Sequence, residues 1–367
     1  MPSSFNVKAS TGEYSVEIGC DLPWADSIDT ANSIIISDGF FSKFLAARGL
    51  KVIEITARET SKDLENMADV IVRLKNLGAN RKTKLVAIGG GVIQDIATFV
   101  ASLYMRGLKW QYLPTTLLGM VDSCIGGKSS INVGTYKNLV GNFYPPQSIC
   151  VDLKFVETLN TEQRAAGLFE AVKICFASNG EEFQRYLNMA PKVSSDKHVM
   201  QDVVCLSLLT KRWFIETDEH DQRERLLLNF GHTFAHAIEG ACNYAMPHGI
   251  AVGAGMLVAI DFARLTGIFH VVPNRVLQLQ EYSESLLATV ANVPCWINQT
   301  SDVALMDRFD SDKKHTTSHY VVILPDANGY LCRVELERTE PVRQLLHTAL
   351  RAILERLTES MPKDSNL

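Results

Sequence analysis

The sequence predicts an α/β N-terminal domain with a Rossmann-like parallel sheet, followed by a mainly α-helical C-terminal domain. Short apolar runs alternate with helical patterns up to about residue 150, and strands that alternate with helices form parallel sheets covered on both faces. Residues 160–290 instead show helical periodicity, including 181–187, 199–214 and 276–287. Because the composition changes at 151–154, we expect one domain at 1–152 and the other at 153–367.

The composition is that of an ordinary globular protein, with 46% hydrophobic and 21% charged residues in 367. The formal net charge of -5 argues against binding to nucleic acid or to an anionic membrane, because both require a basic face. The longest apolar run, 249–260, is too short to cross a bilayer. The eight cysteines form no close pair and no secretory signal is present, so we expect reduced thiols in a cytoplasmic protein.

The first eighty residues contain several short strands and one long helix. Residues 5–18 alternate between polar and apolar, which predicts strands with one buried face. The apolar run at 33–39 ends in the polar residues Ser37 and Asp38. This pattern is typical of a central parallel strand whose carboxyl end carries ligand-facing residues. A further strand is predicted at 49–56 and an amphipathic helix at 61–77.

A glycine-rich turn is the strongest local signal in the N-terminal half. A buried strand at 85–88 leads through Gly89, Gly90 and Gly91 into a helix at 93–105. Such a turn lets backbone N–H groups and a helix N-terminus approach a pyrophosphate, because glycine has no side chain and the helix dipole favours anions. The glycines do not follow the spacing G-x-G-x-x-G, so the turn favours a nucleotide site without excluding an ordinary tight turn.

Lysines beside glycines follow this turn. One more strand is predicted at 110–123, and it offers Thr115 and Thr116. Lys128 comes next, in G-G-K, and Lys137 follows in G-T-Y-K-N. A lysine beside glycines can hold a phosphate as a point charge, although any one of them alone is more often solvated. Further cations stand beside turn residues or candidate metal ligands, which suggests a small, multiply anionic ligand: Arg106, Lys173, Arg225, Lys313 and Lys314.

The second half contains a candidate metal site. His232 and His236 are four residues apart in an apolar helical pattern at 227–239, so both rings project from one face. His248 begins the next helical run, and Glu170 stands earlier in A-G-L-F-E-A-V-K. One carboxylate and two histidines form the ligand set of a catalytic zinc that keeps one position open. An H-x-x-x-H pair on a buried helix is, by spacing alone, more often structural.

The neighbours of these histidines favour a ligand. Arg225 and Asn229 continue the spacing of His232 and His236, so four polar side chains are predicted on one face of an otherwise apolar helix. Burial of such a stripe without partners would cost several kcal/mol, which favours a wet, liganded cavity. Beyond it, 315–331 predicts a strand and a hairpin turn, and Pro341 opens a last amphipathic helix.

Together these motifs resemble the 3-dehydroquinate synthase family of the sugar phosphate cyclase superfamily. The resemblance extends from about residue 14 to 330. It rests on G-G-G-V-I-Q-D, Y-M-R-G, P-T-T-L-L, V-D-S-C-I-G-G-K, Y-K-N-L-V-G, E-A-V-K, R-x-x-x-N-F-G-H-T-F-A-H-A-I-E, P-H-G-I-A-V and S-D-K-K. This ordered set is specific for the superfamily and less so for the substrate.

The resemblance implies a cytoplasmic, homodimeric lyase that depends on NAD and a divalent metal, zinc or cobalt, and acts on a small anionic sugar phosphate of the shikimate pathway. Metal would bind Glu170, His232 and His248. NAD would meet Asp38, Glu59, Lys62, Gly90, Gly91, Asp95, Thr115, Thr116, Asp122, Lys137 and Thr158. The substrate's phosphate and carboxylate would be held by Arg106, Lys128, Asn138, Lys173, Arg225, Asn229, His236 and Lys314. In the family, the residue matching Arg106 reaches the neighbouring site of the dimer.

The chemistry implied is a redox cycle within one site, in which NAD is reduced and regenerated. A hydroxyl is oxidised, phosphate is eliminated, the hydride returns, the ring opens and an aldol step closes the carbocycle. Arg225 with Asn229 suits a carboxylate and favours 3-deoxy-arabino-heptulosonate 7-phosphate, which would give 3-dehydroquinate. The alternatives are a cyclase that converts sedoheptulose 7-phosphate to a valiolone-type cyclitol, a metal-dependent polyol or glycerol-phosphate dehydrogenase, and a non-catalytic nucleotide-binding scaffold.

The chain departs from the family pattern at several positions. Gln94 and Ala235 replace glycine, Ile250 replaces glutamate, and N-F-Y-P-P differs from the usual F-x-Q-P. Loss of an acid at Ile250 would change how the His248 ring is oriented.

Overall fold

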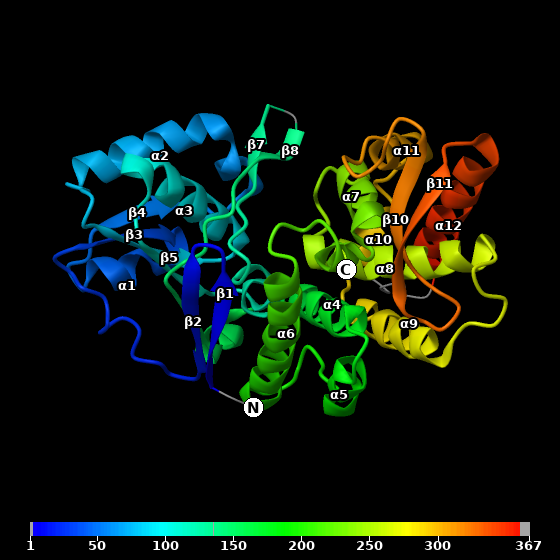
Figure 1. Ribbon diagram of the computed structural model, residues 1–367, viewed down its shortest axis with the longest axis horizontal. Coiled ribbons are helices and arrows are strands. Elements are labelled where there is room, and N and C mark those ends of the chain that lie inside the picture. The colour runs from blue at the N-terminus through cyan, green and yellow to red at the C-terminus, as the bar shows by residue number, and fades with distance from the viewer. Residues whose placement is uncertain (1–2, 135, 360–367) are drawn as a thin grey trace, which may run out of the picture. The chain divides into compact units, whose positions relative to one another are not determined.

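Figure 1 shows the computed structural model, which describes residues 3–134 and 136–359. The chain forms two compact units, and each combines segments that are separate in the sequence. The first unit comprises Met1–Leu159 and Asp196–His220, and the second comprises Asn160–Ser195 and Asp221–Leu367. These units differ from the predicted ranges mainly at 196–220, which lie within the range predicted for the C-terminal domain.

Helix α6 (Lys197–Thr217) joins the first unit because its polar side chains bond to residues near position 120. Ser207 Oγ donates to the Val121 carbonyl at 2.9 Å, and Lys211 Nζ lies 2.8 Å from Asp122 Oδ1. Both acceptors lie in a π-helical turn, η4 (Gly119–Ser123). Periodicity predicts this helix but carries no information about the unit it packs against.

The first unit contains a seven-stranded sheet in the order β1-β2-β9-β6-β5-β3-β4. β1 and β2 pair antiparallel, whereas the later neighbours pair parallel, which confirms the predicted parallel sheet. The strands are β1 (Ser4–Ala9), β2 (Gly12–Gly19), β3 (Ser33–Asp38), β4 (Val52–Ile55), β5 (Lys84–Gly89), β6 (Trp110–Pro114) and β9 (Ser148–Asp152).

The helices predicted in the N-terminal part of this unit are α2 (Leu64–Asn76) and α3 (Gly91–Leu103). The strand predicted at 110–123 is wrong beyond Pro114, because the chain turns there and Thr116 Oγ1 accepts a hydrogen bond from Gly119 N at 3.2 Å. The remaining short elements are η1 (Gly39–Phe41), α1 (Ser42–Ala46), η2 (Glu59–Lys62), η3 (Tyr104–Arg106), β7 (Ile131–Val133), β8 (Tyr136–Val140) and η5 (Leu153–Thr158).

The second unit is mainly helical, as predicted, and carries one antiparallel hairpin formed by β10 (His319–Pro325) and β11 (Leu331–Glu337). Its helices are α4 (Thr161–Ala177), α5 (Glu182–Met189), η6 (Glu224–Asn229), α7 (His232–Ala241), α8 (His248–Leu265), α9 (Asn274–Leu287), α10 (Val293–Ile297), α11 (Asp302–Asp310) and α12 (Glu340–Glu359).

Helix α8 is the centre of this unit. Its 18 residues have a mean hydropathy of 1.4, so by length and composition it could cross a membrane, and it exceeds the apolar run expected from the sequence. However, 78% of the helix is buried inside the structure, as expected of the core helix of a globular fold.

Candidate active site

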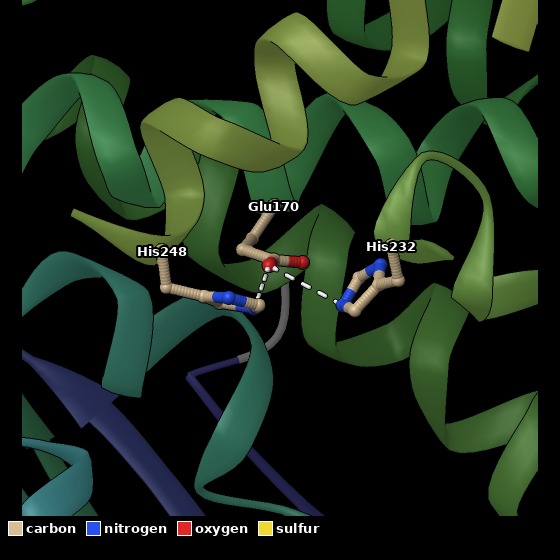
Figure 2. Close-up of side chains that lie close together, drawn as sticks. All are labelled: Glu170, His232 and His248. Carbon is tan, nitrogen blue, oxygen red and sulfur yellow. Dashed lines mark ion pairs between the residues drawn. The ribbon is translucent and has the colours of Figure 1, made fainter. Parts of the chain in front are cut away.

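Three side chains from three helices of the second unit converge on one point. Glu170 lies within α4, and His232 and His248 are the first residues of α7 and α8. Figure 2 shows the three side chains pointing toward one another. Glu170 Oε1 lies 3.3 Å from His248 Nε2 and 3.8 Å from His232 Nε2. One ligand atom from each residue can be chosen so that all lie within 4.8 Å of one another.

Glycines on α8 allow these helices to approach closely. A Cβ at Gly253 would meet the ring of Phe169, the neighbour of Glu170, at 2.5 Å. A Cβ at Gly249 would overlap the Ala166 carbonyl of the same helix. A Cβ at Gly255 would overlap the carbonyl of Gly231, the residue before His232. Side chains at these positions would push α4 and α7 away from α8, so the glycines help to bring the three ligands together.

The three residues fit a divalent cation. Among the described residues, Glu170 Oε1 is buried without a hydrogen-bond partner, whereas Lys173 Nζ donates to the other oxygen, Oε2. The Nδ1 atom of His232 lies 3.3 Å from the Phe230 carbonyl, and that of His248 lies 3.3 Å from Glu239 Oε1. When each Nδ1 donates its proton to these acceptors, each Nε2 offers a lone pair on the side of Glu170. A metal ion would satisfy the buried oxygen and both lone pairs.

The charges of the site suit metal binding. Burial would raise the pKa of Glu170, but Lys173 and His248 outweigh it and lower this pKa to about 2. Burial and the positive charge of Lys173 lower the pKa of His232, so its ring is neutral, as a ligand must be. Burial would lower the pKa of His248 as well, but Glu239 and Glu170 raise it to about 10. Without metal, this ring is therefore doubly protonated, and a cation would displace one of the two protons.

The predicted polar stripe that joins Arg225 and Asn229 to the two histidines is wrong. Gly231 has a φ of 76°, so the chain breaks between η6 and α7 and no single helix runs from 227 to 239. Arg225 is buried on η6, and Asn229 Nδ2 donates to the Leu226 carbonyl at 3.1 Å. The break arises because Gly231 lies against α8, where a Cβ would meet Met256 N at 2.9 Å.

His236 and Lys314, both predicted to bind substrate, lie beside the candidate metal ligands. The centre of the His236 ring is 5.9 Å from that of His232 and 6.2 Å from that of His248. Both His236 and Lys314 contact one carboxylate, that of Asp312. Burial lowers the pKa of His236 despite this carboxylate.

In the first unit, several residues predicted to bind NAD form a network of ion pairs. Lys62 Nζ lies 2.8 Å from Asp95 Oδ2 and 3.4 Å from Glu59 Oε1, and Lys137 Nζ lies 3.8 Å from the same Glu59 oxygen. Burial would lower the pKa of Lys62, but Asp95 and Glu59 raise it. Asn138, predicted to bind substrate, accepts from Lys62 Nζ at 3.2 Å and so belongs to the same network.

The glycine turn lies at the N-terminus of α3, as predicted. Gly90 precedes the helix, and a Cβ there would meet Thr116 Cγ2 at 2.9 Å. Gly91, the first helical residue, has open space around its Cα. Thr115 is buried and its N–H donates to the Gly89 carbonyl at 3.0 Å.

The other predicted residues of the first unit lie in separate turns. Asp38 caps η1 by accepting from Phe40 N at 2.9 Å, Thr158 Oγ1 donates to the Phe155 carbonyl at 2.7 Å, and Lys128 Nζ lies 5.8 Å from the centre of the Phe143 ring. Arg106 is exposed and has a φ of 69°. The roles of all these residues stay predictions.

Three contacts escape the sequence-based analysis. Glu239 contacts His248, Asp312 contacts His236, and Lys211 contacts Asp122. Glu239 and Asp312 stand inside the motifs H-A-I-E and S-D-K-K, so their identities were visible in the sequence. The directions of their side chains could not be predicted, because the histidine that each one contacts comes from a different segment of the chain.

Comparison with known proteins points to a single family. Residues 52–166 match the model of the 3-dehydroquinate synthase N-terminal domain, and residues 167–315 match that of the C-terminal domain. The chain is 34% identical to 3-dehydroquinate synthase of Saccharolobus solfataricus over 77% of its own length and 80% of that protein. It is 35% identical to the Xylella fastidiosa enzyme over 92% and 90% of the two chains.

Solved structures with the same fold include two other cyclases. A 2-deoxy-scyllo-inosose synthase complexed with carbaglucose-6-phosphate, NAD+ and Co2+ superimposes with a TM-score of 0.80 at 21% identity, over 95% of this chain and 99% of that one. The 2-epi-5-epi-valiolone synthase of Streptomyces hygroscopicus with NAD+ and Zn2+ superimposes with a TM-score of 0.74 at 23% identity, over 94% and 97%. At these identities the likeness establishes the fold.

Proposed function

The chain belongs to the 3-dehydroquinate synthase family, and we propose that it converts 3-deoxy-arabino-heptulosonate 7-phosphate into 3-dehydroquinate and phosphate. The reaction would proceed by transient oxidation, phosphate elimination, re-reduction and intramolecular aldol closure. The observation that carries the proposal is the convergence of Glu170, His232 and His248, because this set suits a catalytic metal with an open position.

NAD and a divalent ion, zinc or cobalt, would supply transient hydride acceptance and Lewis acidity when bound. Glu170, His232 and His248 would hold the ion, and Lys173 would keep the Glu170 carboxylate oriented through Oε2. The N-terminus of α3 with Gly90 and Gly91 would take the NAD pyrophosphate. Two cyclase structures with the same fold contain NAD+ together with Co2+ or Zn2+, which supports the choice of these cofactors.

The carboxylate of the substrate is assigned to Arg225. A guanidinium is planar and always charged, so it can pair with a carboxylate through two parallel hydrogen bonds. Arg225 is buried in the same unit as the candidate metal ligands. A cyclase acting on sedoheptulose 7-phosphate, which has no carboxylate, is the second candidate.

Assembly and location form part of the proposal. Leu103 and Met105, on either side of the start of η3, are 51% and 39% exposed next to Arg106. Burial of such apolar side chains against a second copy would favour a homodimer. The eight cysteines are free within the described chain, which suits a reducing compartment such as the cytoplasm.

The test supplies the two heptulose phosphates separately, each with NAD and zinc, and measures phosphate release and NADH. We expect phosphate release from the carboxylated sugar without net NADH. Release from sedoheptulose 7-phosphate alone would establish the second candidate. Net NADH from a simple polyol would instead establish a dehydrogenase.

The assignment of the carboxylate is tested with Arg225→Ala. This variant should lose most turnover of the carboxylated sugar while it retains zinc, because Arg225 is not a metal ligand. If the variant lost zinc to the same extent as it lost turnover, the role given to Arg225 would be contradicted.

A further inference from the structure

Asp312 follows helix α11 and contacts two residues that belong to separate segments. Its Oδ2 lies 3.0 Å from His236 Nδ1, on α7, and 3.5 Å from Lys314 Nζ. Its Oδ1 accepts from the backbone N–H of Lys314 at 2.9 Å. The carboxylate therefore joins α7 to the loop after α11 at the place where both predicted substrate residues stand.

Exposure separates the roles of the three residues. The Asp312 side chain is 2% exposed, whereas those of His236 and Lys314 are 37% and 20% exposed. A ligand can thus reach the imidazole and the ammonium but not the carboxylate behind them. Any influence of Asp312 on a ligand must act through these two neighbours.

The carboxylate also selects one form of the imidazole. Burial would raise the pKa of Asp312, but His236 and Lys314 outweigh it and hold this pKa below its usual range. An ionised carboxylate has acceptors only, so the hydrogen at this contact must come from His236 Nδ1. A neutral imidazole has a single N–H, and the 3.0 Å contact with Asp312 Oδ2 requires that this N–H is on Nδ1. Nε2 is then left with a lone pair.

A neutral imidazole of this form cannot donate from Nε2. It can accept a hydrogen bond from a hydroxyl but cannot donate one to a phosphate or carboxylate oxygen. This differs from the role that the family resemblance gives to His236. Lys314, which has only donors, keeps the role of binding an anion.

We propose that Asp312 is a positioning residue that orients Lys314 toward the anionic sugar and fixes His236 as the Nδ1–H tautomer, so that Nε2 accepts a hydrogen bond from a substrate hydroxyl. The identity of the substrate rests on the proposed function. The tautomer and the orientation do not, because they follow from contacts within this chain.

The direct test is nitrogen NMR of histidine side chains in the full-length, zinc-loaded protein labelled with 15N. Long-range 1H–15N spectra distinguish the two neutral tautomers and the protonated ring, and the variant His236→Gln assigns the signals. We expect the Nδ1–H pattern in the unsubstituted protein. An Nε2–H pattern or a doubly protonated ring would overturn the proposal.

Two variants extend the test. In Asp312→Asn, His236 should lose its exclusive Nδ1–H pattern, because an amide offers both a donor and an acceptor. The matched control is Asp310→Asn, whose partners in the described chain are Tyr320, Arg338 and Arg343. That substitution removes a carboxylate two residues away and should leave the His236 signals unchanged. Equal changes in both variants would reduce Asp312 to a structural residue and contradict the proposal.

Kinetics provide a second readout. Asp312→Asn should lower kcat by roughly 10- to 100-fold while zinc content stays unchanged, as expected when the support of a functional side chain is removed. In combination with His236→Gln it should add little to the loss of kcat, because both act through one ring. Full additivity would contradict the proposal. Failure of the unsubstituted protein to convert the sugar would count against the proposed function, whereas its NMR spectrum would still decide the tautomer.

Discussion

The candidate metal site of the second unit and the ion-pair network of the first unit solve the problem of buried charge differently. In the network, Lys62 lies between Asp95 and Glu59, so cation and carboxylates neutralise each other. In the metal site, Lys173 occupies one oxygen of Glu170, whereas the other oxygen is buried without a hydrogen-bond partner among the described residues. The first arrangement is complete within the protein. The second would be completed by an ion.

The largest expected effect is the loss of metal from His232→Ala. Zinc affinity should fall by more than roughly 100-fold, the upper end for removal of an outer partner of a metal ligand, because a ligand itself is lost. Turnover should disappear with the metal. Zinc content is measured by mass spectrometry after gel filtration, with His270→Ala, an exposed histidine of the same unit, as control. Retention of zinc would place the ion elsewhere.

The counterpart in the first unit is Lys62→Met. Because this leaves the Asp95 carboxylate partly buried without its ion pair, the free energy of unfolding should fall by roughly 3 kcal/mol. Zinc content should not change, since the network is not a metal site. Urea unfolding measures the loss, and Lys82→Met, at an exposed lysine, gives the baseline. A loss of zinc in Lys62→Met would remove the distinction between the two regions.

A smaller effect is expected from Glu239→Gln. Glu239 Oε1 lies 3.3 Å from His248 Nδ1, so it orients the ring that must present Nε2 to the ion. Position 250, where the family pattern has glutamate, is the buried, apolar Ile250 in this chain. Zinc affinity should fall roughly 10- to 100-fold, and the visible spectrum of the cobalt protein should change. Glu337→Gln, at an exposed glutamate, is the control. Unchanged affinity would show that Glu239 does not support His248.

The smallest effect for a single step, about tenfold for one pH unit, is a dependence of zinc affinity on pH. Without metal, the pKa of His248 is about 10, so the ring is protonated below that pH and a cation must displace one proton. The lowered pKa of Glu170, about 2, and the lowered pKa of His232 mean that these residues release none. Affinity should therefore rise about tenfold per pH unit between 6 and 8, measured by competition with a chelator. A flat profile would contradict the protonated state of His248.

Much of the fold could be predicted from the sequence, because it depends on local patterns. The continuous apolar run at 33–38 predicted a buried strand, and the helical periodicity at 64–76 predicted an amphipathic helix. The structure confirms both elements. The unit that α6 joins could not be predicted, because it depends on Lys211 and Ser207 meeting a turn some ninety residues earlier.

The candidate ligands themselves were identified from residue types and motifs, but their surroundings were not. Gly231 breaks the predicted helix because it lies against α8, a contact between residues distant in sequence. The contacts of Glu239 with His248 and of Asp312 with His236 could not be predicted for the same reason. The direction of each carboxylate is fixed by packing between segments that are separate in the sequence. Periodicity reports which face a residue occupies and not which side chain it meets.

The most direct test of the candidate site is anomalous diffraction at the zinc absorption edge, from crystals of the zinc-loaded protein. We expect one strong peak about 2 Å from Glu170 Oε1 and from the Nε2 atoms of His232 and His248. A peak bound by other residues, or three side chains directed to different places, would contradict the account.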